Sequence, residues 1–85
     1  MKHRVDTTID GIPVTFTGGP VNANQSHYPT AWLSPVFGEE YRKDYRGFIR
    51  RLHQEMIKQM AANGWQTNVA PNLARMACPD NWSPS

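Results

Sequence analysis

A long amphipathic pattern in the middle of this 85-residue chain limits the folds that are open to it. The pattern begins at Ser34-Pro35, where a side chain able to cap a helix precedes a proline suited to the first helical turn. It ends at Asn63-Gly64, a typical C-terminal cap. We therefore predict one helix over residues 35–63. In so short a chain, the apolar side of that helix must be covered by a second layer of structure.

Apolar and aromatic side chains lie on one side of the predicted helix when each residue advances by about 100°. They form a single stripe that consists of Tyr41, Tyr45, Phe48, Ile49, Leu52, Met56 and Met60. A stripe this broad is typical of a helix packed on a core. We therefore interpret it as structural and not as a ligand pocket.

The N-terminal residues 4–17 have the pattern of a β-hairpin. Polar and apolar residues alternate on either side of Asp10-Gly11. Asp-Gly favours a two-residue type I′ turn, because both central positions of that turn need a positive φ. Pro13 lacks an N–H donor, so we expect it at a sheet edge or at a position that does not pair.

The rest of the chain supplies one more predicted strand and two irregular segments. Residues 18–34 are rich in Gly, Pro, Asn and Ser and are predicted to be a loop, with a possible fourth strand at residues 30–34. Residues 65–70 alternate and predict a strand, and residues 71–85 predict an irregular tail. The predicted fold is a single α+β domain. It has an N-terminal β-hairpin and one long amphipathic helix packed on a small antiparallel sheet, which a strand near residues 65–70 completes.

Charges on the polar side of the predicted helix pair locally. Glu39 precedes Lys43 by four residues, and Arg51 precedes Glu55 by four. Glu55 also precedes Lys58 by three. We expect each pair to stabilise the helix by about 0.2–0.5 kcal/mol.

Three arginines repeat every four residues along one edge of the stripe. We call Arg42, Arg46 and Arg50 the arginine ridge. Guanidinium groups bind carboxylate or phosphate through two parallel hydrogen bonds, so the ridge is a candidate contact for an acidic protein surface or for a nucleic-acid backbone. In the alternative interpretation the arginine stems only cover the edge of the core. A positive face shared with Arg4 would favour nucleic acid.

Three aromatic residues outside the helix are candidates for partner binding. Tyr28 and Trp32 lie among adaptable polar residues, and Trp82 lies in the polar tail. Rigid aromatic anchors among Asn, Ser and Gln resemble protein contact surfaces. The alternatives are that Trp32 belongs to the core and that the tail folds back so that Trp82 covers the core.

Catalytic and metal-binding patterns are weak in this sequence. The single cysteine, Cys78, lies in a Pro-flanked tail without a neighbouring histidine, and one thiol builds neither a disulfide nor a cysteine-based zinc site. The histidines His3, His27 and His53 lack paired ligand spacing. We predict that the protein is not an enzyme and that it holds no metal and no cofactor.

Composition bounds the compartment and the partner. The net charge of +2 is mild for a nucleic-acid-binding domain of this size. One cysteine suits a reducing compartment, and the chain has neither a secretory leader pattern nor the ~20 apolar residues of a membrane span. We expect a cytoplasmic protein that does not enter the membrane.

Together these patterns favour a small non-enzymatic protein-binding module, a regulator, inhibitor or adaptor that docks on a partner protein. One alternative is a nucleic-acid-binding module that uses the arginine ridge. Another is a minor subunit whose core is completed in a larger assembly.

Overall fold

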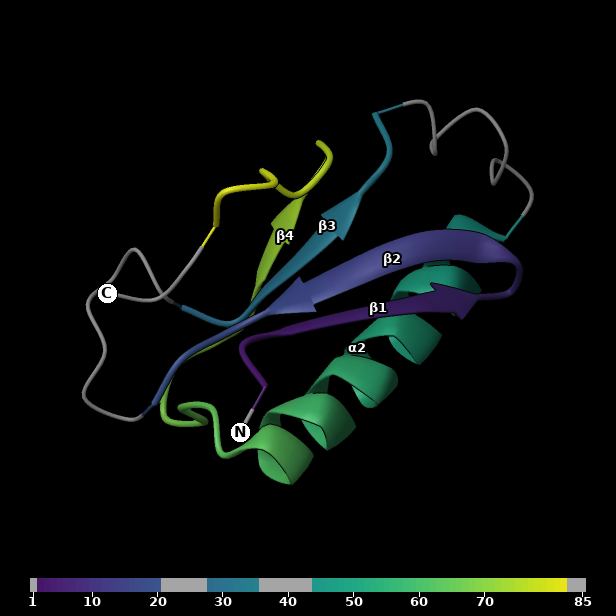
Figure 1. Cartoon of the computed structure of the whole chain (residues 1–85). Coiled ribbons are helices and arrows are strands. Elements are labelled where there is room, and N and C mark those ends of the chain that lie inside the picture. The colour runs from purple at the N-terminus through teal and green to yellow at the C-terminus, as the bar shows by residue number, and fades with distance from the viewer. Residues whose placement is uncertain (1, 21–27, 36–43, 83–85) are drawn as a thin grey trace.

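In the part of the chain that the structure describes, a four-stranded sheet with one helix packed on it forms the fold (Figure 1). The computed structural model describes residues 2–20, 28–35 and 44–82. Its elements are β1 (Arg4–Ile9), β2 (Ile12–Thr17), β3 (Thr30–Leu33), α2 (Tyr45–Asn63) and β4 (Asn72–Ala74). The strands lie in the order β1-β2-β3-β4, and the backbone of α2 comes closest to that of β1. The predicted α+β class with an N-terminal hairpin is confirmed.

The hairpin turn has the predicted geometry. Asp10 and Gly11 have φ values of 54° and 83°, so both central positions adopt the positive φ that a type I′ turn requires. Pro13 lies opposite Thr8, while the pairing of β2 with β3 begins only at Val14. Pro13 therefore lies beyond the end of β3, where its missing N–H removes no bond of the sheet.

The core lies between α2 and one face of the sheet. Every second residue of the strands faces the helix and packs against the apolar stripe predicted for α2. The buried apolar residues are Ile9, Ile12, Val14, Phe16, Ala31, Leu33, Phe48, Leu52, Met56, Met60 and Trp65. Tyr45 and Ile49 pack against this set and are partly buried. The predicted orientation of the helix is thus confirmed, except that Tyr41 lies outside the described residues.

The two ends of α2 differ in how they are capped. At the C-terminal end Gly64 has a φ of 70°, and the Trp65 N–H donates to the Met60 carbonyl at 3.0 Å, as in a Schellman cap. The N-cap residue is Asp44, whose side chain makes no capping hydrogen bond. Residues 36–43, which include most of the predicted first turns, lie outside the described residues.

The last strand differs from the prediction in place and direction. Residues 65–70 form no strand, and β4 lies further on, at Asn72–Ala74. Trp65 and Gln66 are both only 2% exposed, so two successive side chains are buried and the expected alternation fails. β4 also pairs parallel to β3, so the sheet is mixed and not antiparallel throughout. Residues 71–85, predicted as an irregular tail, therefore contain a strand.

The face of the sheet away from α2, which we call the open face, is partly covered. Thr17 is fully buried there and accepts a 2.7 Å hydrogen bond from the indole N–H of Trp32. This bond joins β3 to β2 and pairs the indole N–H with the Thr17 hydroxyl where both are shielded from water. The open face is thus less exposed to solvent than the alternation of polar and apolar residues in the hairpin predicted.

Candidate interaction surfaces

One side of α2 carries the described part of the arginine ridge. Arg46, Arg50, His53 and Ile57 follow one another at spacings of four, three and four residues and are all exposed, and we call them the outer flank. Neither arginine has an ion-pair partner among the residues that the structure describes. Ile57 is 59% exposed, so the outer flank carries a large apolar side chain beside the two arginines. Arg42 lies outside the described residues.

Arg75, from the C-terminal part of the chain, lies beside the first residue of α2. Arg75 donates a 2.6 Å hydrogen bond to the Tyr45 hydroxyl, and its guanidinium lies 5.4 Å from the centre of the Tyr45 ring. Such a cation–π contact holds the charge beside α2. Leu73 and Met76, on either side of Arg75, are 39% and 54% exposed. Positive charge and apolar surface are therefore mixed in this region.

Arg4 does not join the arginine ridge. Its side chain lies on the open face, where it pairs with Asp6 at 3.3 Å, whereas α2 covers the opposite face of the sheet. The hydrogen bond that Thr15 donates to Asp6 at 2.7 Å lowers the pKa of Asp6, and Arg4 lowers it further. The single positive face that would have favoured nucleic acid is not formed with Arg4.

The charge pairs of α2 differ in part from those expected. Glu55 pairs with Lys58 at 3.8 Å, as predicted. Arg51, however, binds Asp10 of the hairpin turn at 2.6 Å and Asp44 at 3.2 Å. The hydrogen bond with Asp10, followed by that with Asp44, raises the pKa of Arg51. Arg51 thus ties the N-terminal part of α2 to the turn between β1 and β2.

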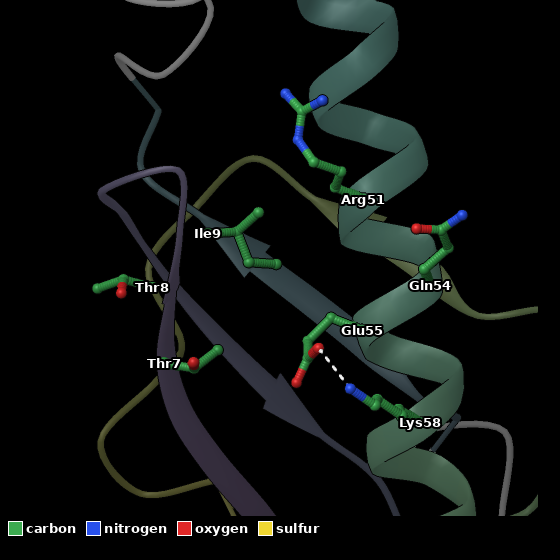
Figure 2. Close-up of a pocket in the computed structure, with 7 residues that line it drawn as sticks. All are labelled: Thr7, Thr8, Ile9, Arg51, Gln54, Glu55 and Lys58. Carbon is green, nitrogen blue, oxygen red and sulfur yellow. Dashed lines mark ion pairs between the residues drawn. The ribbon is translucent and has the colours of Figure 1, made fainter.

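A groove of about 610 Å³ lies between β1 and α2 (Figure 2). Figure 2 shows Glu55 pointing from α2 toward β1, and Thr7 pointing from β1 toward α2. The lining residues are Thr7, Thr8, Ile9, Arg51, Gln54, Glu55 and Lys58. The groove is polar apart from Ile9, and it follows the outer side of β1, the first strand of the sheet.

A smaller pocket of about 270 Å³ lies on the open face. Trp32 and Thr15 of the sheet line it together with Cys78 and Asp80 of the C-terminal segment. The C-terminal segment therefore reaches the same face as Trp32. Partial burial raises the pKa of the Cys78 thiol. The charge of Arg4 opposes this effect, and the carboxylates of Asp6 and Asp80 add to it.

The raised pKa of Cys78 leads to a reactivity prediction. Because the thiolate is the reactive form, Cys78 in the folded protein should react with iodoacetamide more slowly than the same residue in urea-unfolded chain at pH 7.5. The two rates should converge as the pH rises above the raised pKa. Mass spectrometry of timed samples measures both rates. Equal rates at pH 7.5 would contradict the raised pKa of this partly buried thiol.

The three aromatic candidates occupy different parts of the structure. Trp32 is half-buried on the open face, and the Tyr28 carbonyl accepts a 2.8 Å hydrogen bond from the Thr30 hydroxyl just before β3. Trp82 is half-buried, and its backbone N–H donates to the Pro79 carbonyl at 3.1 Å. That Tyr28, Trp32 and Trp82 form one contact patch stays a prediction.

Within residues 2–20, 28–35 and 44–82, His, Cys, Asp and Glu side chains form no group of three that would hold a metal ion. No helix in this part of the chain is long and apolar enough to cross a membrane.

Comparison of the chain with protein-family models, with curated proteins and with solved structures finds no match. The fold and the surfaces described above define a small α+β protein, and they carry the argument about its function.

Proposed function

We propose that this protein is a non-enzymatic binding module that docks through the outer flank of α2 on an acidic surface of a partner protein. The observation that carries the proposal is the exposure of Arg46 and Arg50 without ion-pair partners in the described part of the chain, next to the exposed Ile57. Arginine is enriched at protein interfaces, where its guanidinium binds carboxylates bidentately. Regulator, inhibitor and adaptor roles all fit a module of this kind.

The mixture of charge and apolar surface favours a protein over a nucleic acid as the partner. Nucleic-acid interfaces are more polar and much more positively charged than protein interfaces. Here Ile57 lies on the same side of α2 as the two arginines, and Leu73 and Met76 are exposed on either side of Arg75. Apolar groups of this size gain from contact with protein, whereas a phosphate backbone offers them little.

Charge reversal on the outer flank tests the proposal. A partner is first captured on the immobilised protein from the native host and identified by mass spectrometry. We expect Arg50→Glu to weaken its binding by about tenfold or more, since reversal places like charges against each other. Isothermal titration calorimetry at two salt concentrations measures the loss, which should shrink at high salt.

The matched control is Lys2→Glu, which changes the net charge by the same amount at an exposed residue outside α2. This variant should bind the partner like the unmodified protein. Equal losses for both variants would mean that only net charge matters and would contradict docking through the outer flank. Tight binding of random duplex DNA at about 0.15 M salt, abolished by Arg46→Ala/Arg50→Ala, would favour the nucleic-acid module instead.

A further inference from the structure

The outer edge of β1 has backbone groups that point away from the sheet. Ile9 and Ile12 flank the two-residue turn, so this pair exchanges hydrogen bonds across the hairpin. Every second residue back along β1 also pairs with β2, and the bond from the Gly18 N–H to the His3 carbonyl follows the same alternation. The N–H and C=O groups of Arg4, Asp6 and Thr8 therefore point outward. No backbone partner for them is found among the described residues.

The edge of β1 has few of the devices that usually protect an edge strand. Natural edge strands carry a proline, a bulge or charged side chains, lysine above all, or are covered by other structure. β1 has regular register with β2 along its whole length and contains neither proline nor lysine, and its two charged residues, Arg4 and Asp6, pair with each other. The groove beside it is open to solvent and is lined on its far side by α2. The edge is thus both regular and accessible.

We propose that an extended segment of a partner protein binds in this groove by adding a strand to the outer edge of β1. A row of outward N–H and C=O groups is complemented by another extended backbone, and strand addition of this kind gives affinity through main-chain hydrogen bonds. Alternate side chains of the added segment then face α2. This surface lies on a different side of α2 from the outer flank and is independent of the function proposed above.

The charges along α2 indicate an acidic side chain in the bound segment. Arg51 is already held by Asp10 and Asp44. Lys58 is 78% exposed and lies 3.8 Å from Glu55, at the long end of the ion-pair range, so its ammonium remains accessible. An aspartate or glutamate of the added segment that faces α2 would bind the Lys58 ammonium together with Glu55. The ammonium has three N–H donors, and this second carboxylate would accept from one that Glu55 leaves unused.

A second copy of this chain fits the edge less well. Neighbouring strands lie about 4.7–4.9 Å apart, whereas packed helices need about 8–10 Å between their axes. Since α2 lies closest to β1, two copies joined along β1 would crowd two helices together on one side of the sheet. A pairing centred on Asp6 would also place two aspartates opposite each other, which is destabilising. An extended segment without a helix meets neither obstacle.

A proline at an outward position tests the strand addition. The probe is a library of random linear peptides displayed on phage and selected on the immobilised full chain. Thr8→Pro removes one outward N–H and leaves the inward bonds of β1 in place, and we expect it to weaken the selected peptides by about tenfold or more. Thr8→Ala, which loses the same hydroxyl but keeps the N–H, should bind within about twofold of the unmodified protein. Thermal melts establish that both variants are folded.

A second measurement leaves the protein unchanged, in case Thr8→Pro does not fold. Replacing single amides of a selected peptide by esters removes one N–H at a time. Only every second N–H of the added strand points toward β1, so esters at those positions should weaken binding and esters at the positions between them should not. Lys58→Glu should disfavour acidic peptides, and Arg50→Glu should leave peptide binding unchanged.

Three results would overturn the proposal. One is a library that yields no peptide above background, and another is peptides that bind folded Thr8→Pro as well as the unmodified protein. The third is a dimer of the unmodified chain in sedimentation that becomes a monomer in Thr8→Pro, which would assign the edge to a second copy.

Discussion

Replacing Leu52 by alanine is expected to lower the free energy of unfolding by about 2–5 kcal/mol. Leu52 is fully buried on α2 between Phe48 and Met56, where the helix meets the sheet. Truncation removes buried apolar surface and leaves a cavity that a close-packed core fills only in part. Small domains are stable by only about 5–15 kcal/mol, so the loss is a large fraction of the total. Urea titration followed by circular dichroism measures it.

The matched control for this prediction is Ile57→Ala on the same helix. Ile57 is 59% exposed, so its truncation removes little buried surface and should change the free energy of unfolding by under about 1 kcal/mol. Equal destabilisation by the two substitutions would show that the helix does not face the sheet as described. Because Ile57 belongs to the outer flank, the same variant should weaken partner binding although it changes the free energy of unfolding so little.

Replacing Gly18 by alanine is expected to be the most disruptive single-methyl change in the described part of the chain. A Cβ atom at Gly18 would lie 2.5 Å from Cδ2 and 2.6 Å from Cε3 of Trp65. The ring has little room to move, because it is buried and its N–H donates a 2.6 Å hydrogen bond to the Lys2 carbonyl. Overpacking of this kind costs typically about 1–3 kcal/mol, and we expect the upper part of that range.

A double-mutant cycle with Trp65→Leu separates the clash from other effects of Gly18→Ala. Trp65→Leu alone should destabilise the protein, since it removes a large buried ring and a hydrogen bond. In that background Gly18→Ala should cost much less, because the smaller side chain leaves space for the added methyl group. Additive effects of the two substitutions in thermal melts would mean that the close approach of Gly18 and Trp65 does not limit stability.

Local patterns predicted those elements whose causes are local. Asp10-Gly11 determines the hairpin because few other dipeptides tolerate two successive positive φ values. Gly64 ends α2 for a similar reason, and the spacing of Phe48 and Leu52 determines which side of the helix is buried. These features are visible in the sequence because each depends on residues only a few positions apart.

The errors concern contacts between residues far apart in the sequence. Trp65 and Gln66 were predicted to begin a strand, but Trp65 packs against Gly18, and the Gln66 N–H donates to the Gly19 carbonyl at 2.8 Å. β4 was missed because its three residues are too few to show an alternation. Its parallel direction depends on how the chain crosses over the sheet, which no local pattern reports.

The same difference between local and long-range contacts decides which candidate sites could be predicted from the sequence. Arg46 and Arg50 were found because helical spacing alone places them together. The groove was missed, since β1 and α2 meet only in the folded chain, and Arg51 was assigned to Glu55 although its partner Asp10 is distant in sequence. The alternating pattern of β1, with no proline or lysine, was the one signal that could have indicated an accessible strand edge.

The parallel pairing of β3 with β4 has a consequence for the order of assembly. The chain between these two strands includes the whole of α2, so their pairing closes a long loop whose entropic cost precedes any gain from contacts. β4 offsets that entropic cost with only three residues of pairing. We therefore expect β4 to join last and to detach first, while the hairpin and α2 remain folded. Each detachment would uncover the outer side of β3 and so make β3 an edge strand of the sheet for part of the time.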